Sequence, residues 1–210
     1  MKVGIIGAGN VGRALAGSLT RGGQTVVVSS TDPKDADAVA AATGARAAAS
    51  NQKLVEASDV VVLAVKFGAI EGLAAQHAAG QPRPGRAALV AKLRQLNRAL
   101  EQAAEATRPD PLRIFDLDTS FHRSYVEAGA GLRLLALHDA IKPQAERYVR
   151  LYTSALVDEI ARSVAEHEKI VEQIEAGSAE GAWRAVQRNW RNAAARLSRV
   201  IHTLGERGSW

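Results

Sequence analysis

The chain has 210 residues, of which 47% are hydrophobic and only 4% aromatic, and it contains no cysteine. The lack of cysteine excludes disulfides, thiolate metal sites and cysteine nucleophiles. The formal net charge of +5 permits an anionic ligand but is weak support for nucleic-acid binding, because arginines are spread along the helical patterns. No apolar run approaches the ~18 residues of a membrane span, so we expect a soluble, cytoplasmic protein that does not engage a membrane.

Residues 1–66 alternate between apolar β-branched runs and helical patterns. Strands are expected at residues 2–6, 25–28, 45–48 and 59–65, and helices at residues 11–21, 32–42 and 52–57. Strands that alternate with helices in this way form parallel βαβ units. The pattern therefore predicts an α/β half-Rossmann segment with a parallel four-strand sheet.

A glycine-rich loop, Gly7-Ala-Gly9-Asn10-Val11-Gly12, follows the first strand and opens the first helix. This is the context that a dinucleotide fingerprint requires. Gly7 permits the tight turn, Gly9 lets a pyrophosphate approach the backbone, and Gly12 allows the helix and strand to pack closely. The helix N-terminus offers free N–H groups and the positive end of its dipole. The loop could bind a dinucleotide, or the fingerprint could serve only the fold.

At the end of the second strand, the residues that would face the adenosine ribose are Ser29, Ser30 and Thr31, with Lys34 nearby. An acidic residue would usually bind the ribose 2′-hydroxyl here. Hydroxyl groups and a lysine suit a 2′-phosphate better, so NADP is favoured over NAD. The alternative is a hydroxyl-rich loop that only caps the next helix.

Strand patterns end at Val65, and helical periodicity continues from there to the end of the chain. We expect a second domain, residues 67–210, after a first domain of residues 1–66. Its predicted helices cover residues 68–79, 86–106, 112–128, 132–151, 154–175 and 178–203. The pattern predicts an all-α six-helix bundle with no strand beyond Val65.

Asp118 and His122 are four residues apart in the third of these helices, so their side chains share one face. A carboxylate and an imidazole aimed at one point are a common start of a divalent-metal site. His167 and Asn189 lie in later helices and are further candidate ligands. The alternative for the first pair is a helix-capping aspartate beside a surface histidine.

The N-terminal segment resembles the deazaflavin-dependent NADP reductases through Met1-Lys-Val-Gly-Ile-Ile-Gly-Ala-Gly-Asn-Val-Gly12 and Asp59-Val-Val-Val-Leu-Ala-Val65. The resemblance implies NADP as a possible cofactor. Those enzymes have more strands and a substrate-binding half, whereas here the strand patterns stop at Val65. Lys66 stands where the relatives often have proline.

Residues 69–203 resemble the FCD domain, the helical effector-binding domain of GntR-type transcription regulators. The matching motifs are Asp118-Thr-Ser-Phe-His122, Ala165-Glu-His167 and Glu172-Gln-Ile-Glu-Ala-Gly177. In that family an aspartate and three histidines bind a metal such as zinc or nickel, at the floor of a pocket for a small carboxylate. Asp118, His122 and His167 match these ligands by position.

Asn189 stands where the family has its last histidine. An amide oxygen is a weaker and harder ligand than imidazole. The resemblance therefore implies either a divalent-metal site with one altered ligand, or a metal-free pocket in which Asn189 only forms hydrogen bonds.

Several arginines lie in the last three helical patterns. Arg147 and Arg150 could bind an effector carboxylate through the guanidinium fork, although a solvated helix face is the favoured explanation for either one alone. The remaining arginines of interest, which we expect to be solvated, are Arg184, Arg188, Arg191, Arg196 and Arg199.

Three functional hypotheses follow. The first is a regulatory protein that senses a small organic acid through a metal and forms a homodimer. It carries the NADP-binding-like segment in place of a winged helix, so we expect it not to bind DNA directly. The second is an NADP-dependent oxidoreductase whose helical part supplies dimerisation and the substrate pocket. The third is a regulator fragment that acts on DNA only through a partner. We favour the sensor.

Overall fold

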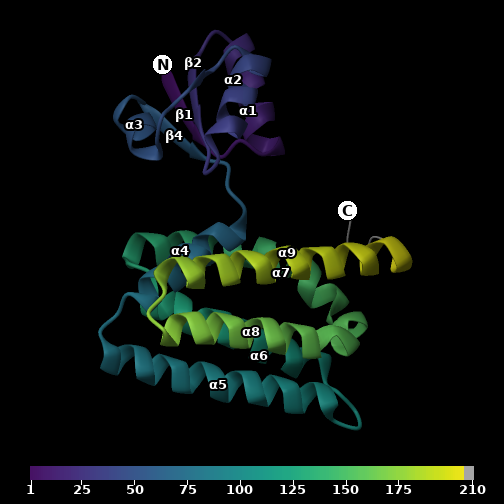
Figure 1. Cartoon of the computed structure of the whole chain (residues 1–210). Coiled ribbons are helices and arrows are strands. Elements are labelled where there is room, and N and C mark those ends of the chain that lie inside the picture. Colours follow the sequence, from purple (N-terminus) through teal and green to yellow (C-terminus); the bar gives the residue numbers. More distant parts are fainter. Residues whose placement is uncertain (206–210) are drawn as a thin grey trace. The chain divides into compact units, whose positions relative to one another are not determined.

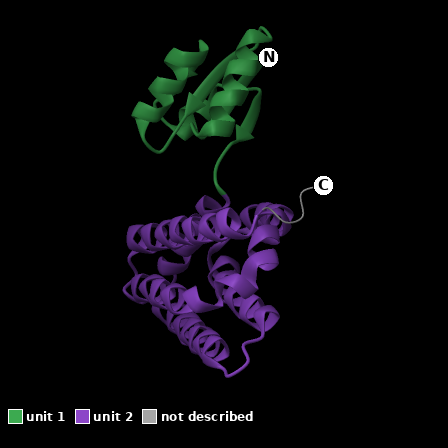
Figure 2. Ribbon diagram, turned by 90° about the vertical axis from the view of Figure 1, so that its right-hand side faces the viewer, with its two compact units in different colours: residues 1–66 green, residues 67–210 purple. Residues whose placement is uncertain are grey.

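The computed structural model describes residues 1–205, and it divides the chain into two compact units that meet between Lys66 and Phe67 (Figure 2). The first unit contains a sheet and three helices, and the second is helical. None of the described helices is both long enough and apolar enough to cross a lipid bilayer.

The first unit is built on a four-stranded sheet in the order β3-β2-β1-β4. The strands are β1 (Lys2–Ile6), β2 (Thr25–Ser29), β3 (Arg46–Ala47) and β4 (Val60–Leu63), and every pair is parallel. Ile5 in the central strand pairs with Val28 on one side and Val62 on the other. The predicted parallel four-strand sheet is confirmed.

The helices of the first unit are α1 (Asn10–Arg21), α2 (Pro33–Thr43) and α3 (Asn51–Glu56), and they cover the sheet (Figure 1). Successive strand residues point to opposite faces. Accordingly, Val3 and Ile5 belong to a buried cluster that includes Ala16 of α1 and Val39 of α2. A Cβ on Gly4 would lie 2.4 Å from the Leu54 side chain of α3. Glycine in this strand therefore lets α3 pack directly onto β1.

The second unit contains six α-helices and one short 3₁₀ turn among the described residues. They are α4 (Phe67–Ala79), α5 (Arg83–Glu105), α6 (Pro111–Gly129), α7 (Leu132–Leu156), η1 (Val157–Glu159), α8 (Ile160–Glu175) and α9 (Ala179–Leu204). The six predicted helices are confirmed, and the described part of this unit contains no strand. The predicted boundary between the fourth and fifth helices was wrong, because no glycine or proline interrupts the chain at residue 151 and α7 continues to Leu156.

Small residues bring α4 into close contact with α9. A Cβ on Gly68 would lie 2.7 Å from the Trp190 ring, and one on Gly72 would lie 2.8 Å from the Gln187 amide. The central cluster of this unit also contains Phe121 and Tyr125 of α6, both fully buried. Helix α6 therefore lies inside the bundle, and polar side chains on it must find partners there.

Candidate metal site

Helices α6 and α8 bring together the candidate ligands Asp118, His122 and His167. The three residues offer ligand atoms that all lie within 4.8 Å of one another. The N-cap of α6 is Asp110, whose side chain accepts a hydrogen bond from the Leu112 amide, so Asp118 is not a capping residue. His122 is only 9% exposed and is not a surface histidine. Both features contradict the capping alternative.

His167 presents an unpaired nitrogen to this cluster. The side-chain amide of Asn97 donates to the Val164 carbonyl at 3.0 Å, which leaves the Asn97 oxygen to accept from Nδ1 of His167 at 3.1 Å. The buried Nε2 has no hydrogen-bond partner and lies 3.5 Å from Oδ1 of Asp118. Burial and the charges on His122 and Arg196 hold the pKa of His167 well below its usual range. The imidazole is therefore neutral, the form that binds a metal.

His122 is fixed from the other side by Glu71 of α4. Its Nδ1 lies 2.7 Å from Oε2 of Glu71, a carboxylate that is only 2% exposed. Burial alone would lower the pKa of His122, but the charge and hydrogen bond of Glu71 outweigh burial and raise it to about 9. Since Nδ1 is committed to Glu71, Nε2 is the nitrogen open to an ion.

Glu71 is the centre of a wider hydrogen-bond network. Its carboxylate also accepts from Tyr125 Oη at 2.6 Å and Trp190 Nε1 at 2.9 Å, and it lies 3.3 Å from His138 Nε2. Burial would raise the pKa of Glu71, but the positive His122 and these hydrogen bonds hold it well below its usual range. The carboxylate is thus ionised and compensated by groups from α6, α7 and α9.

Asp118 lacks such compensation among the described residues. Its side chain is 31% exposed and lines the cavity, and partial burial raises the pKa of its carboxyl, an effect that the positive charge of His122 only partly opposes. Nε2 of His167 lies 3.5 Å from Oδ1 of Asp118 and forms no hydrogen bond with it. A carboxylate in these surroundings is stabilised by a nearby cation. The donor set, two imidazoles and a carboxylate, fits a divalent ion.

Asn189 lies on the wall of the same cavity as Asp118 and His122. It is 4% exposed, and its side-chain nitrogen donates to Oε2 of Glu166 at 3.0 Å. The amide oxygen is therefore the atom left for the cavity. An oxygen donor in this position would be harder than the imidazole it replaces.

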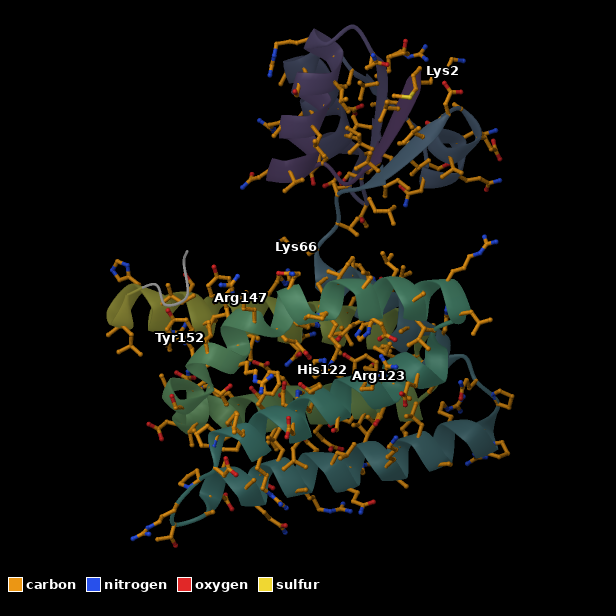
Figure 3. The ribbon with its side chains drawn as sticks, turned by 180° about the vertical axis from the view of Figure 1, so that it is seen from behind. Lys2, Lys66, His122, Arg123, Arg147 and Tyr152 are labelled. Atoms are coloured by element: carbon orange, nitrogen blue, oxygen red, sulfur yellow. The ribbon has the colours of Figure 1, made fainter. Side chains whose placement is uncertain are left out.

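The cavity beside these residues has a volume of about 90 Å³. Figure 3 shows His122 among the helices of the second unit. The walls combine the aliphatic side chains of Ile114, Val149 and Leu197 with the hydroxyl groups of Thr119 and Thr153. A dry cavity of about 150 Å³ can hold benzene, so this smaller one suits a ligand with few non-hydrogen atoms.

The expectation that Arg196 is solvated was wrong. Its guanidinium is buried and binds Glu166 through both terminal nitrogens, at 2.8 and 3.1 Å. Arg196 also lines the cavity, seven residues after Asn189 and on the same face of α9. That spacing is a signal that sequence reasoning did not use. The other four arginines expected to be solvated, Arg184, Arg188, Arg191 and Arg199, are exposed.

Two further polar residues of the site, Glu71 and Asn97, were also missed. Glu71 is the single charged residue in an otherwise small and apolar stretch of α4, and Asn97 occupies a position in the apolar stripe of α5 between Leu93 and Leu100. A lone polar residue in an apolar stripe usually has a buried partner. The partners themselves are distant in sequence, so only the fold identifies them.

Arg147 and Arg150 are not among the residues that line the cavity. They border a second depression between α6 and α7, on the other side of Phe115 and Glu146, which line both. The Arg150 guanidinium carbon lies 5.9 Å from the centre of the Phe115 ring. The structure thus does not bring these two arginines to the metal cluster.

In the first unit, the glycine loop has the geometry of a dinucleotide fingerprint. Gly7 has a φ of 118°, and a Cβ there would lie 2.2 Å from the Ala64 carbonyl oxygen. A Cβ on Gly12 would lie 1.8 Å from the Gly7 carbonyl oxygen, whereas one on Gly9 would meet no atom within 4 Å. The N-terminus of α1 has no side-chain cap, and Asn10 and Val11 are exposed beside it. Gly7 and Gly12 therefore serve the fold, while Gly9 leaves open space.

The hydroxyl residues after β2 are not equivalent. Ser29 is 1% exposed, and its hydroxyl donates to Oδ1 of Asn51 at 2.8 Å, so this group is engaged inside the unit. Thr31 and Lys34 are exposed and Ser30 is partly exposed. Asp32 caps α2 by accepting from the Lys34 amide. Three of the four predicted 2′-phosphate contacts are accessible.

Comparison with known families gives two matches. Residues 67–192 match the family described as FCD domain, and residues 2–86 match the family described as NADP oxidoreductase coenzyme F420-dependent. The order of the two segments agrees with both resemblances seen in the sequence, and the matches overlap across α4. No curated protein matches the chain.

Proposed function

The chain belongs to the FCD domain family, and we propose from this membership that it is a regulatory protein whose helical unit senses a small organic acid through a divalent cation. The observation that carries the proposal is the buried, unpartnered Nε2 of His167 beside Asp118 and His122. A buried imidazole nitrogen without a partner is costly unless a ligand occupies it.

The proposed ligands are His122, His167, Asp118 and the amide oxygen of Asn189. Two imidazoles and a carboxylate suit zinc or nickel, and the amide oxygen weakens the set relative to a third imidazole. A bound cation would supply positive charge for the carboxylate of an effector. Glu71 and Asn97 hold the two imidazoles in orientation through their other ring nitrogens.

Metal titration of the full chain tests this function. Zinc or nickel should bind at one ion per chain and raise the melting temperature. The His167→Gln variant should lose this binding, whereas His202→Gln, the same change at an exposed position of α9, should retain it. Equal binding by both variants, or no binding by the unaltered protein, would exclude the site.

The second candidate function is NADP binding by the first unit, favoured by the open space at Gly9 and the uncapped N-terminus of α1. NADP should bind more tightly than NAD because Ser30, Thr31 and Lys34 can reach a 2′-phosphate. Equal affinities in a titration would remove this argument. Reduction of a substrate by bound NADPH would favour the oxidoreductase hypothesis over the sensor.

The proposed sensor would form a homodimer, as FCD domains are expected to do, and would not bind DNA directly. Sedimentation of the full chain with and without zinc measures whether the homodimer forms. For the hypothesis of a regulator that reaches DNA through a partner, no residue of the described structure provides specific support.

A further inference from the structure

We propose that Glu146 makes the cavity selective for ligands with a single carboxylate, so that dicarboxylates of the same length are excluded. The inference rests on the proposed function, because it takes the ligand's first carboxylate to be bound by the cation. The rest of the ligand would then contact the other residues that line the cavity.

The described lining residues give the cavity an excess of negative charge. Four carboxylates lie on its walls, and they are opposed by the His122 imidazole, which is bound to Glu71, and by the guanidinium of Arg196; the carboxylates are Glu71, Asp118, Glu146 and Glu159. Both terminal nitrogens of Arg196 are already bound to Glu166, and one also binds Ser163. No lining residue therefore offers an uncommitted cation to a second carboxylate.

Glu146 lies on the cavity wall and contacts Thr119, the residue that follows the proposed ligand Asp118. One of its oxygens accepts from the Thr119 hydroxyl at 3.2 Å, and the other lies 3.0 Å from Nζ of Lys142. Lys142 lines the outer depression and not the cavity, whereas Glu146 lines both. The negative end of this ion pair is thus on the cavity side.

Each of the other wall carboxylates, like Glu146, has a positively charged partner or is a proposed ligand. Glu71 is bound by His122, and Glu159 pairs with Arg162 at 2.8 Å and with Arg199 at 3.6 Å. Asp118 is a proposed ligand of the cation. The cavity is small, about 90 Å³, and Glu146 is bound to Thr119 beside the proposed ligand Asp118, so we expect the far end of a four-carbon ligand held at the cation to lie near Glu146. A methyl group there would contact aliphatic walls, whereas a carboxylate would be repelled.

Butyrate and succinate test the inference, because both have four carbons and differ by one carboxylate. Zinc-loaded full chain should bind butyrate at least about tenfold more tightly than succinate in calorimetric titrations. Glu146→Gln keeps the size and the Thr119 contact but removes the charge and frees Lys142, so succinate affinity should rise and the preference should shrink to about threefold or less.

Two further variants make the result specific. Lys142→Gln leaves Glu146 without its cation and should widen the preference for butyrate. Glu127→Gln, on the exposed side of α6, changes the net charge by the same amount and should leave the preference unaltered. Melting curves confirm that each variant is folded.

Succinate binding as tight as butyrate binding in the unaltered protein would overturn the inference, and so would an unaltered preference in both Glu146→Gln and Lys142→Gln. Failure of both acids to bind a chain that holds zinc would also overturn it. Failure to hold zinc would overturn the proposed function first, and the metal titration distinguishes that case.

Discussion

Nδ1 of His122 and Oε2 of Glu71 lie 2.7 Å apart inside the helical unit, although 51 residues separate them in the chain. This contact orients the imidazole and selects which of its nitrogens faces the cavity. It also neutralises a carboxylate that an apolar helix would otherwise leave without a counter-charge.

Glu71→Gln should weaken zinc binding by about 10- to 100-fold, because the residue behind a ligating histidine sets its orientation and basicity. Chelator competition measures the affinity. His138→Gln is the matched control, since His138 contacts the other oxygen of the same carboxylate and is not a proposed ligand. An equal loss of affinity in both variants would indicate that Glu71 supports only the fold.

His122→Ala should abolish zinc binding and also destabilise the metal-free protein, by about 3–5 kcal/mol, because it leaves the buried Glu71 without its cation. Urea unfolding in the presence of a chelator measures the second effect. The double variant Glu71→Gln/His122→Ala should recover part of the loss. A metal-free His122→Ala protein as stable as the parent would contradict this account of the pair.

Asn189→His should raise zinc affinity, since imidazole is a stronger donor to zinc than an amide oxygen. Affinity for a harder ion such as manganese should rise less. Competition titrations with the two ions give the ratio. An unaltered zinc affinity in this variant would mean that residue 189 does not reach the ion, and Asn189→Ala would then bind zinc as well as the parent protein.

The stability of the metal-free protein should fall as the pH rises from about 6.5 to about 9. The folded pKa of His122 is raised to about 9, above the unfolded value of about 6.5, so its contribution is complete below the lower value and lost through the higher one. The difference between the folded and unfolded pKa values corresponds to about 3 kcal/mol of unfolding free energy. Urea unfolding with a chelator at pH 6 and pH 9.5 measures it, and Glu71→Gln should flatten the dependence.

Gly12→Ala and Gly9→Ala should distinguish a structural role of the glycine loop from a role in NADP binding. A Cβ at Gly12 would meet backbone at 1.8 Å, so this change should destabilise the unit, whereas the space at Gly9 is open and its change should leave the melting temperature nearly unaltered. If the loop binds NADP, Gly9→Ala should weaken that binding. Unaltered NADP affinity in a folded Gly9→Ala protein would favour a fingerprint that serves only the fold.

Most of the fold could be predicted because it depends on local patterns. The change from β-branched runs to helical periodicity at Val65 defines the elements, and Gly7 and Gly12 occupy positions where the backbone leaves no room for a side chain. The end of α7 was missed because no residue there marks a helix end. The turn at η1 depends on how α7 meets α8.

The candidate site could be predicted only in part. Asp118 and His122 share a helix face, and the FCD resemblance contributed His167 and Asn189. The residues that orient these ligands come from α4 and α5 through contacts such as Asn97 with His167, 70 residues apart. Arg196 lies seven residues after Asn189 on the same face of α9, and this spacing indicates a position at the site, but its partner Glu166 lies in another helix. Tertiary packing brings Arg196 and Glu166 together.

Trp190 donates its indole N–H to the same oxygen of Glu71 that His122 contacts, and its ring centre lies 5.8 Å from that of His122. The protein therefore has an intrinsic fluorophore at the site. Loss of the His122 proton on ion binding would change the electric field across the indole and with it the wavelength and intensity of emission. Trp183, which packs against Gly72 on another turn of α9, offers a reference signal in the same spectrum. Binding of an ion could then be followed by tryptophan fluorescence in the unlabelled protein. Trp190→Phe should abolish the change in emission.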